Sequence, residues 1–252
     1  MRVYMPDKRL KLKIFGHWGA YPGAGEATSC YQISAEGFNL FLDLGSGALT
    51  LLQNEISTRE IDALIISHYH SDHIADVGCL QYAVRIDTEL GLNSSVLPIY
   101  GHGEDPYFEK LSHKNFTAAV LYGADSVLSI GPFTVTFCRT VHPDCCYAVR
   151  VAYGEKSIVY TADTEYFDGL AEFSRGTDLL LCESSLYEGY RRAVPGHMSS
   201  GEAAELAEKG GVKSLVLTHL PHFGEHGLLL EQARAVFKGP IQLAESGLSL
   251  LI

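Results

Sequence analysis

One short segment constrains this chain more than any other, because three histidines and an aspartate fall within six residues. An apolar run covers residues 61–67, and the cluster that follows it is His68, His70, Asp72 and His73. A continuous apolar run of this length is typical of a strand buried on both faces. Burying so many polar side chains at its end is costly unless something ligates them. Imidazole and carboxylate groups together suit zinc, iron or manganese, so the segment predicts a metal site at the end of a buried strand.

Single metal-binding side chains also follow three later apolar runs. His142 comes after the run at 133–140, Asp163 follows the run at 157–162, and His219 follows the run at 214–218. A lone histidine at such a place is more often an ordinary core or surface residue. Three successive strand ends downstream of the first cluster favour a shared site instead.

The remaining segments predict two groups of strands with helices between and after them. Further strands are expected at residues 12–18, 30–35, 38–44, 97–101, 147–153, 178–183, 241–244 and 248–252. Helices are expected at residues 74–90, 199–209 and 225–237; Ser199 and Glu202 form a capping-box pattern at the start of the second one. Two sheets packed face to face would produce this order, and so would a doubly wound sheet, because periodicity does not separate the two.

Length, charge and cysteine usage limit the kind of protein. The 252 residues carry a formal charge of −11 and are 46% apolar, which fits one globular domain over residues 1–252 and disfavours broad nucleic-acid binding. Residues 1–13 are short and charged, so no signal segment is expected, and no apolar stretch is long enough to span a membrane. The six cysteines include no CxxC pair, which indicates reduced thiols and a cytoplasmic location.

The ordered motifs resemble those of the metallo-β-lactamase superfamily, and within it the branch of ribonuclease Z, which trims tRNA 3′ ends. The cluster from His68 to His73 matches the family's HxHxDH signature, and the segment from Asp43 to Gly47 is similar to its first motif. His142, Asp163 and His219 match the later ligand motifs. The resemblance covers nearly the whole chain. It implies an α/β fold, an αβ/βα sandwich of two mixed sheets with outer helices, in which the metals lie between the sheet edges.

The resemblance also implies two divalent metal ions, with zinc as the expected metal and manganese or iron as alternatives. By this match one metal takes His68, His70 and His142. The other takes His73, His219 and Asp72, which is also counted among the catalytic residues. Asp163 and a hydroxide would bridge the two ions, and metal binding would depress the pKa of that water toward neutrality.

Two further residues resemble catalytic groups of the ribonuclease Z branch. His197 resembles the histidine that faces the scissile phosphate and could donate a proton to the leaving oxygen. Glu183 resembles an acidic residue of that branch that could orient His197. The alternatives are a loop histidine that caps a helix and a solvated carboxylate at a strand end. His222 and His226 lie close to His219 in the sequence and are expected at the rim of the pocket at most.

One departure from ribonuclease Z narrows the expected substrate. Its long tRNA-gripping arm lies between the third histidine motif and the bridging aspartate, where this chain has only residues 143–162, enough for a hairpin. We therefore expect a hydrolase of small or single-stranded phosphodiesters, without tRNA as a substrate and without a membrane partner. A hydrolase of esters, thioesters or lactones is the alternative, and a metal-binding module without catalysis is a third. A homodimer is left open.

Overall fold

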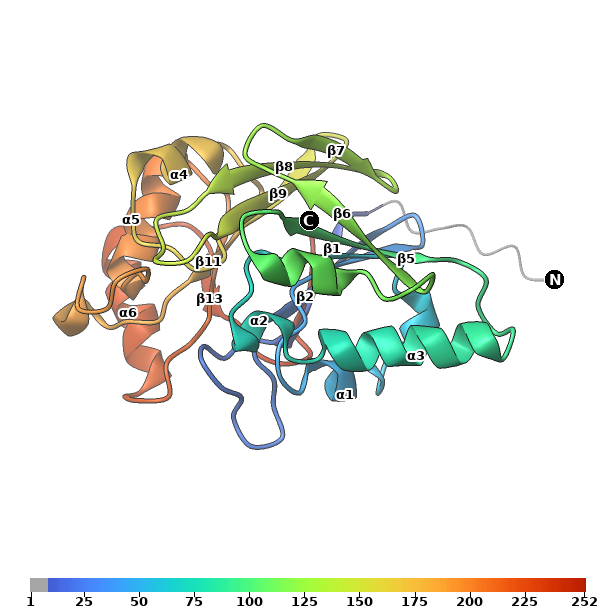
Figure 1. The fold of residues 1–252 in the computed structure, drawn as a ribbon. Helices are drawn as coiled ribbons and strands as arrows, with labels where there is room; N and C mark the ends of the chain where they lie inside the picture. The colour runs from blue at the N-terminus through green and yellow to red at the C-terminus, as the bar shows by residue number, and fades with distance from the viewer. Residues whose placement is uncertain (1–8) are drawn as a thin grey trace.

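Two seven-stranded sheets packed face to face form the centre of the molecule in the computed structural model, which describes residues 9–252 (Figure 1). The first sheet has the order β14-β1-β2-β3-β4-β5-β6, with the bounds β14 (Ser249–Leu251), β1 (Lys11–Gly16), β2 (Cys30–Ala35), β3 (Phe38–Leu42), β4 (Ala63–Ile65), β5 (Leu97–His102) and β6 (Thr117–Tyr122). The second has the order β13-β12-β11-β10-β9-β8-β7, with the bounds β13 (Ile241–Leu243), β12 (Leu215–Thr218), β11 (Leu179–Glu183), β10 (Lys156–Tyr160), β9 (Tyr147–Tyr153), β8 (Phe133–Arg139) and β7 (Val127–Ile130). Residues 1–8, where no signal segment is expected, lie outside the described residues.

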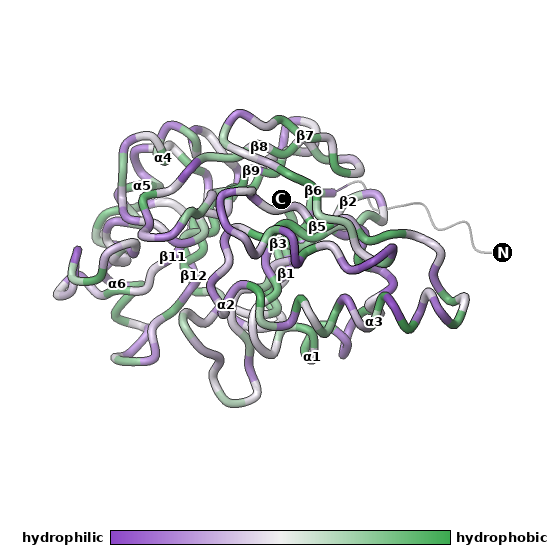
Figure 2. The backbone as a smooth tube through the Cα atoms, in the orientation of Figure 1, coloured by the Kyte–Doolittle hydropathy of each residue, from purple (hydrophilic) through white to green (hydrophobic). Residues whose placement is uncertain are grey.

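Helices cover the outer face of each sheet. The first sheet carries α1 (Ala48–Leu52), α2 (Ser71–Ile74) and α3 (Val77–Glu89), and the second carries α4 (Asp168–Phe173), α5 (Ser200–Gly210) and α6 (His226–Val236) (Figure 1). Along α3 the tube of Figure 2 alternates between purple and green, as expected for a helix with one buried face. Short 3₁₀ turns lie at η1 (Thr58–Glu60), η2 (Pro106–Leu111) and η3 (Glu188–Tyr190). Across residues 9–252, no helix combines the length and the apolar character needed to cross a bilayer.

Three apolar layers hold these elements together. The middle layer lies between the sheets and includes Ile33, Ile65 and Val149, all fully or almost fully buried. One outer layer packs the first sheet against α1 and α3, and the other packs the second sheet against α4, α5 and α6. The structure thus confirms the four-layer αβ/βα sandwich and excludes a doubly wound sheet.

Several predicted boundaries were wrong, for local reasons. The strand expected at 38–44 ends at Leu42, because Asp43 adopts a left-handed backbone with φ 57°. The helix expected at 74–90 begins only at Val77, since Ser71–Ile74 forms a separate helical turn. The run expected as a strand over 61–67 is a strand only at Ala63–Ile65. Strands β6 and β7 and helices α1 and α4 were not predicted.

The strand directions bring the predicted ligands to one place. Strands β3, β4, β5 and β6 are parallel to each other in the first sheet, and β10, β11, β12 and β13 in the second. Polar residues that follow the carboxyl ends of parallel strands therefore share one edge. Hydrogen bonds join the sheets at this edge, among them Tyr160 to Asp43 at 2.9 Å and Tyr31 to Thr218 at 2.8 Å.

Candidate metal centre

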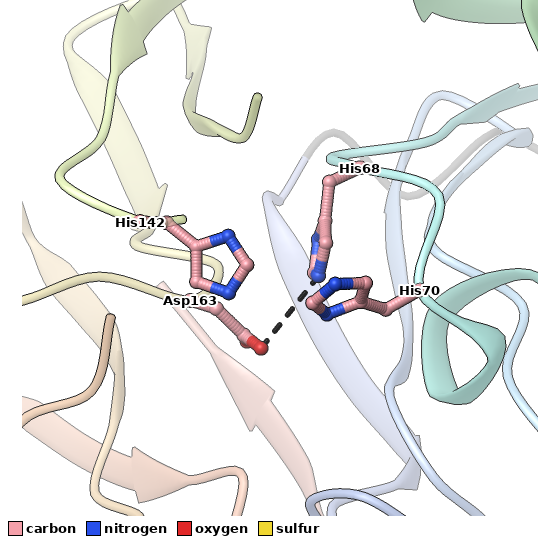
Figure 3. A group of neighbouring side chains, drawn as sticks. All are labelled: His68, His70, His142 and Asp163. Carbon is pink, nitrogen blue, oxygen red and sulfur yellow. Dashed lines mark ion pairs between the residues drawn. The ribbon is translucent and has the colours of Figure 1, made fainter. Parts of the chain in front are cut away.

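Four side chains from both halves of the chain form the first ligand cluster. His68 and His70 come from the segment after β4, whereas His142 follows β8 and Asp163 follows β10. One nitrogen or oxygen of each lies within 4.8 Å of those of the others. Figure 3 shows the three imidazoles and the carboxylate pointing into a common space, with His68 Nε2 3.7 Å from Asp163 Oδ2.

A second cluster lies next to the first and shares Asp163 with it. It contains Asp72, His73, Asp163 and His219, all buried. His219 Nε2 lies 3.1 Å from Asp72 Oδ2 and 3.4 Å from Asp163 Oδ2. The structure therefore brings together all seven residues predicted as metal ligands, with Asp163 in both clusters.

The donor set fits metal ions, because several buried polar atoms here lack a hydrogen-bond partner. These atoms are His68 Nε2, His73 Nε2 and Asp163 Oδ1. Buried polar atoms are normally paired, and an unpaired one costs about 1–3 kcal/mol. Converging imidazole nitrogens and carboxylate oxygens are what divalent zinc, iron or manganese binds, so ions at the two clusters would satisfy these atoms.

Asp43 holds His73, one of two fully buried histidines of the centre, in place. Its Oδ2 lies 2.7 Å from His73 Nδ1, so Nε2 of the same ring points to Asp163. Ser67 donates its backbone N–H and its hydroxyl to the same carboxylate, at 2.7 Å and 2.8 Å. A carboxylate behind a ligating histidine fixes the tautomer and raises the basicity of the ligand nitrogen.

The other histidines of the clusters also have partners for the ring nitrogen that faces away from the centre. Asp144 Oδ2 lies 2.6 Å from His70 Nε2, which leaves His70 Nδ1 to face the first cluster. His142 Nδ1 contacts the backbone oxygen of Asp144 at 3.1 Å, and His219 Nδ1 contacts the hydroxyl of Ser185 at 2.8 Å. These contacts orient the ligand nitrogens toward one another.

The histidines of the two clusters differ in the direction of their pKa shifts. Burial lowers the pKa of His68 and of His142, so both are neutral and offer a lone pair at physiological pH. Burial alone would also lower the pKa of His73, but the charges of Asp163 and Asp43 outweigh it and raise that pKa well above its usual value. Metal binding at His73 would therefore release a proton.

His197 and Glu183 form a pair beside the two clusters. His197 Nδ1 lies 3.0 Å from Glu183 Oε1, and its ring stacks on that of His219 with centroids 5.5 Å apart. Glu183 is fully buried and also accepts hydrogen bonds from the Thr164 N–H and the Ser185 hydroxyl. The alternative of a solvated carboxylate at a strand end is therefore wrong for Glu183. His197 does not cap α5 either, because the Ser199 hydroxyl does so.

This pairing sets the charge of His197. Burial lowers its pKa, but the charge and the hydrogen bond of Glu183, helped by Asp163 and Asp72, outweigh that effect and raise the pKa to about 9. The ring therefore carries a proton at neutral pH, unlike His68 and His142.

Three residues at this edge have a left-handed backbone. Asp43 has φ 57°, Ala162 φ 50° and His219 φ 53°. Such angles are uncommon outside glycine and cost on the order of 1–3 kcal/mol each, so they persist only where the surroundings enforce them. Here each ends or follows a strand at the point where the chain presents a polar group to the centre.

The loop at residues 17–26 covers the second cluster. The backbone N–H of Ala20 donates to Asp72 Oδ2 at 2.8 Å, and a β-carbon on Gly19 would lie only 2.8 Å from the ring of His219. His222 stacks between Trp18 and Tyr21 at the rim of the pocket, which is where the sequence led us to expect it.

The sequence predicted no role for Ser185 or Asp144, and it assigned Asp43 to a motif without a specific function. Asp144 lies two residues after His142, and Ser185 lies two residues after Glu183, so proximity to a predicted ligand was the available signal. Such proximity is common along any chain and does not single out a contact.

The comparisons with known proteins agree with this geometry. Residues 40–220 match the family model described as a Beta-lactamase superfamily domain. The probable metallo-hydrolase YhfI of Bacillus subtilis (strain 168) is 43% identical over 239 residues, which cover 94% of this chain and 98% of that protein. The crystal structure of YhfI superposes with a TM-score of 0.95 at 42% identity, covering 97% of this chain and all of that chain (100%).

More distant similarities are to a ribonuclease Z and to a diphosphatase of the PhnP family. Ribonuclease Z of Haloarcula marismortui is 23% identical over 299 residues, covering 95% of this chain and 96% of that protein. A diphosphatase of the PhnP family shares the fold, with a TM-score of 0.76 at 18% identity and coverage of 96% and 97%. With the family model spanning most of its length and YhfI aligned almost end to end, the chain belongs to the metallo-β-lactamase superfamily and resembles its ribonuclease Z branch.

Proposed function

We propose that this protein is a two-metal phosphodiesterase that hydrolyses small phosphodiesters, with His197 as the general acid. Zinc is the proposed metal, because a mixed set of imidazoles and carboxylates suits it, and manganese and iron are the alternatives. The six cysteines are all free, which is consistent with the reducing cytoplasm.

The His197–Glu183 pair is the observation that carries this proposal. A protonated imidazole, held at 3.0 Å by a buried carboxylate, lies against His219 of the second cluster. Hydrolysis of an unactivated phosphodiester needs a proton for its departing alkoxide, and a positioned acid typically contributes about 10²–10⁴-fold. A cationic acid also favours a substrate that is itself an anion.

The remaining residues have supporting tasks. Metal ions bound by the two clusters would polarise the phosphoryl oxygens and lower the pKa of a bound water. Asp163 contributes a carboxylate to both clusters, and the Ala20 N–H fixes the carboxylate of Asp72. Glu183 keeps His197 oriented through Nδ1, so that Nε2 is the nitrogen that can deliver the proton.

The short connection between His142 and Asp163 favours a small substrate. Residues 143–162 form the hairpin of β9 and β10, which pairs within the second sheet. With this short connection and the acidic charge of −11, we expect precursor tRNA to be a poor substrate.

The test is a substrate panel with metal-loaded protein. Bis(p-nitrophenyl) phosphate should be hydrolysed much faster than a lactone or a thioester, and precursor tRNA should be cleaved far more slowly than the diester. A lactone or thioester as the best substrate would replace the phosphodiesterase with an ester hydrolase. Zinc binding without turnover of any compound would leave a metal-binding module.

A further inference from the structure

Two cavities of opposite character border the metal centre. The apolar pocket has a volume of about 300 Å³ and is lined by Tyr21, Leu186, Val194, Pro221 and Phe223, with His197 and His219 at its inner end. The polar pocket has a volume of about 370 Å³ and is lined by Tyr69, His70, His102, Glu104, Asp105, Arg139 and Asp144. Both volumes suit part of a small molecule.

Three large apolar or aromatic side chains of the apolar pocket are exposed to solvent. Tyr21 is 58% exposed, Phe223 47% and Val194 44%. Single exposed apolar residues are ordinary, but a concave group of them beside a polar centre indicates a binding surface.

The wall that presents Tyr21 is rigidly built. The ring of Tyr21 stacks on His222 with centroids 3.6 Å apart and an interplanar angle of 4°, and His222 stacks on Trp18 at 4.4 Å. His222 Nε2 also contacts the backbone oxygen of Tyr21 at 2.6 Å. The loop itself is tied to residues 219–223 by the Gly19 N–H, which donates to the Leu220 oxygen at 3.1 Å. A preformed apolar surface binds its ligand without first paying to order the wall.

His197 relates this pocket to the reaction. If His197 protonates the departing oxygen, that oxygen lies within hydrogen-bonding distance of its ring. The carbon group attached to the oxygen then starts at His197, which forms the inner end of the apolar pocket. The other substituent of phosphorus must leave the centre on a different side, and the polar pocket is a second cavity that shares a lining residue, His70, with the first cluster.

We propose that the apolar pocket binds the departing alcohol of the diester and that the polar pocket binds the group that stays on phosphorus. This proposal rests on the phosphodiesterase function and on His197 as the acid. The substrate class is an unsymmetrical phosphodiester whose leaving group is apolar and whose retained group is polar. Water adds to phosphorus and releases one proton to solvent, the bond from phosphorus to the apolar alcohol's oxygen breaks, and His197 supplies the proton of the released alcohol and regains one from solvent.

The polar pocket indicates which retained groups fit. It contains the carboxylates of Glu104, Asp105 and Asp144 and the single guanidinium of Arg139, which pairs with Glu104. Carboxylates accept hydrogen bonds but do not donate them. A retained group with hydroxyl, amide or amine donors is therefore favoured over one that carries a further negative charge.

An unsymmetrical diester tests this direction of binding. The probe carries a 2-naphthyl group on one oxygen and a 3-carbamoylphenyl group on the other. The two phenols have similar acidity, so their intrinsic leaving ability does not decide which bond breaks. The ratio of 2-naphthol to 3-hydroxybenzamide released by metal-loaded protein should be about 10 or more, equivalent to about 1.4 kcal/mol.

Variants assign that ratio to the pocket. Tyr21→Ala and Phe223→Ala should each lower the ratio several-fold, whereas Tyr82→Ala on α3 should leave it unchanged. Tyr82 is a matched control, because it is 56% exposed and lies outside both pockets. The ratio is internal to each sample and does not depend on how much metal a variant holds.

The outcomes separate the two proposals. Equal release of both phenols, an excess of 3-hydroxybenzamide, or ratios untouched by both pocket variants would overturn the assignment of the pockets while leaving the phosphodiesterase intact. Failure to cleave this probe while bis(p-nitrophenyl) phosphate is cleaved would also count against the pockets. If no diester of any kind is hydrolysed, the proposed function fails first.

Discussion

For each histidine at the centre, the partner of the ring nitrogen that faces away from the clusters determines the role open to the other ring nitrogen. His73 shows this most clearly, since Asp43 Oδ2 lies 2.7 Å from Nδ1 and leaves Nε2 to the second cluster. His197 is arranged the same way by Glu183 but lies beside the clusters, and its pKa of about 9 makes it a proton donor. Identical side chains can therefore be neutral or cationic at neutral pH, depending on their neighbours.

Asp43→Asn should weaken metal binding without unfolding the protein. The amide of this variant accepts fewer hydrogen bonds than the Asp43 carboxylate, which contacts Ser67, His73 and Tyr160. The amide also does not raise the basicity of the His73 ring. Removal of such an outer partner typically costs about 10–100-fold in metal affinity. Competition with a chromophoric chelator measures this loss. Asp62→Asn is the control, because Asp62 accepts a backbone N–H from Asn39 away from the centre; equal losses in both variants would contradict the role of Asp43.

His197→Ala should keep both metals and lose turnover by about 10²–10⁴-fold on diphenyl phosphate, whose leaving group needs protonation. On bis(p-nitrophenyl) phosphate the loss should be much smaller, because p-nitrophenolate departs without a proton. The Michaelis constant should change less than the turnover number, since the interaction develops mainly in the transition state.

Two controls complete this comparison. His113→Ala, which removes a histidine absent from both ligand clusters, should leave both rates unchanged. Equal losses on the two substrates in His197→Ala would remove the acid role, and loss of a metal equivalent would make His197 a ligand.

At the scale of elements, strand ends decide where the polar groups meet. Strands β10, β11 and β12 run parallel, and their carboxyl ends are followed by Asp163, Glu183 and His219. At the opposite edge of the second sheet, Asp178 connects the segments in which β10, β11 and β12 begin. It accepts hydrogen bonds from Lys213 at 2.8 Å, from the Ser157 N–H at 2.9 Å and from Lys156 at 3.1 Å.

Asp178→Asn should lower the free energy of unfolding at pH 7 by about 1.5–3 kcal/mol, the usual range for hydrogen bonds to a charged group. Burial raises the pKa of Asp178, but Lys213, the Ser157 N–H and Lys156 outweigh it and lower that pKa. The stabilisation is therefore present above the unfolded pKa of about 3.9 and is lost as pH falls through the lower folded value.

Urea unfolding measures this effect at several pH values. The gap between wild type and Asp178→Asn should narrow as the pH falls below about 4. Asp168→Asn is the matched control, because Asp168 pairs with Lys209 on the surface, where such pairs contribute about 0–1 kcal/mol. A gap that stays constant with pH would contradict the role assigned to the Asp178 charge.

At the scale of the whole molecule, the centre lies where the two sheets meet and takes ligands from both. His68, His70, Asp72 and His73 come from the first half, whereas His142, Asp163 and His219 come from the second. Metal ions would therefore crosslink the halves. Ligands that bind only the folded state stabilise it in proportion to the logarithm of their concentration.

Zinc added to metal-depleted protein should bind close to two equivalents and raise the melting temperature. At a free concentration of 1,000 times Kd each site adds about 4 kcal/mol, and a chain of this size gains about 2–4 °C per kcal/mol. Metal analysis after dialysis and calorimetry measure both quantities. Asp163→Ala should lose most of the gain, since Asp163 belongs to both clusters. One equivalent with full activity would contradict the two-metal mechanism.

The sequence alone was enough to predict the family and the residues that the structure brings together in the two clusters. These residues form local patterns that can be recognised without the structure. One is a histidine cluster directly after a buried strand, and the others are single histidines or aspartates after later strands. The same patterns led to the αβ/βα sandwich through their family resemblance. The helix that Ser199 caps was also predictable, because its capping box is a contact between residues three positions apart.

The contacts between distant segments became visible only in the folded molecule. Tyr160 reaches Asp43 across 117 positions, Ala20 reaches Asp72 across 52, and β14 pairs with β1 from the far end of the chain. The edge strands β6 and β7 escaped prediction because their partly exposed residues, such as Leu121 at 61% and Val127 at 69%, lack a clear apolar period. Which side chain stands behind each ligand, and which pocket opens beside it, depends on packing in three dimensions, and no spacing along the chain encodes that.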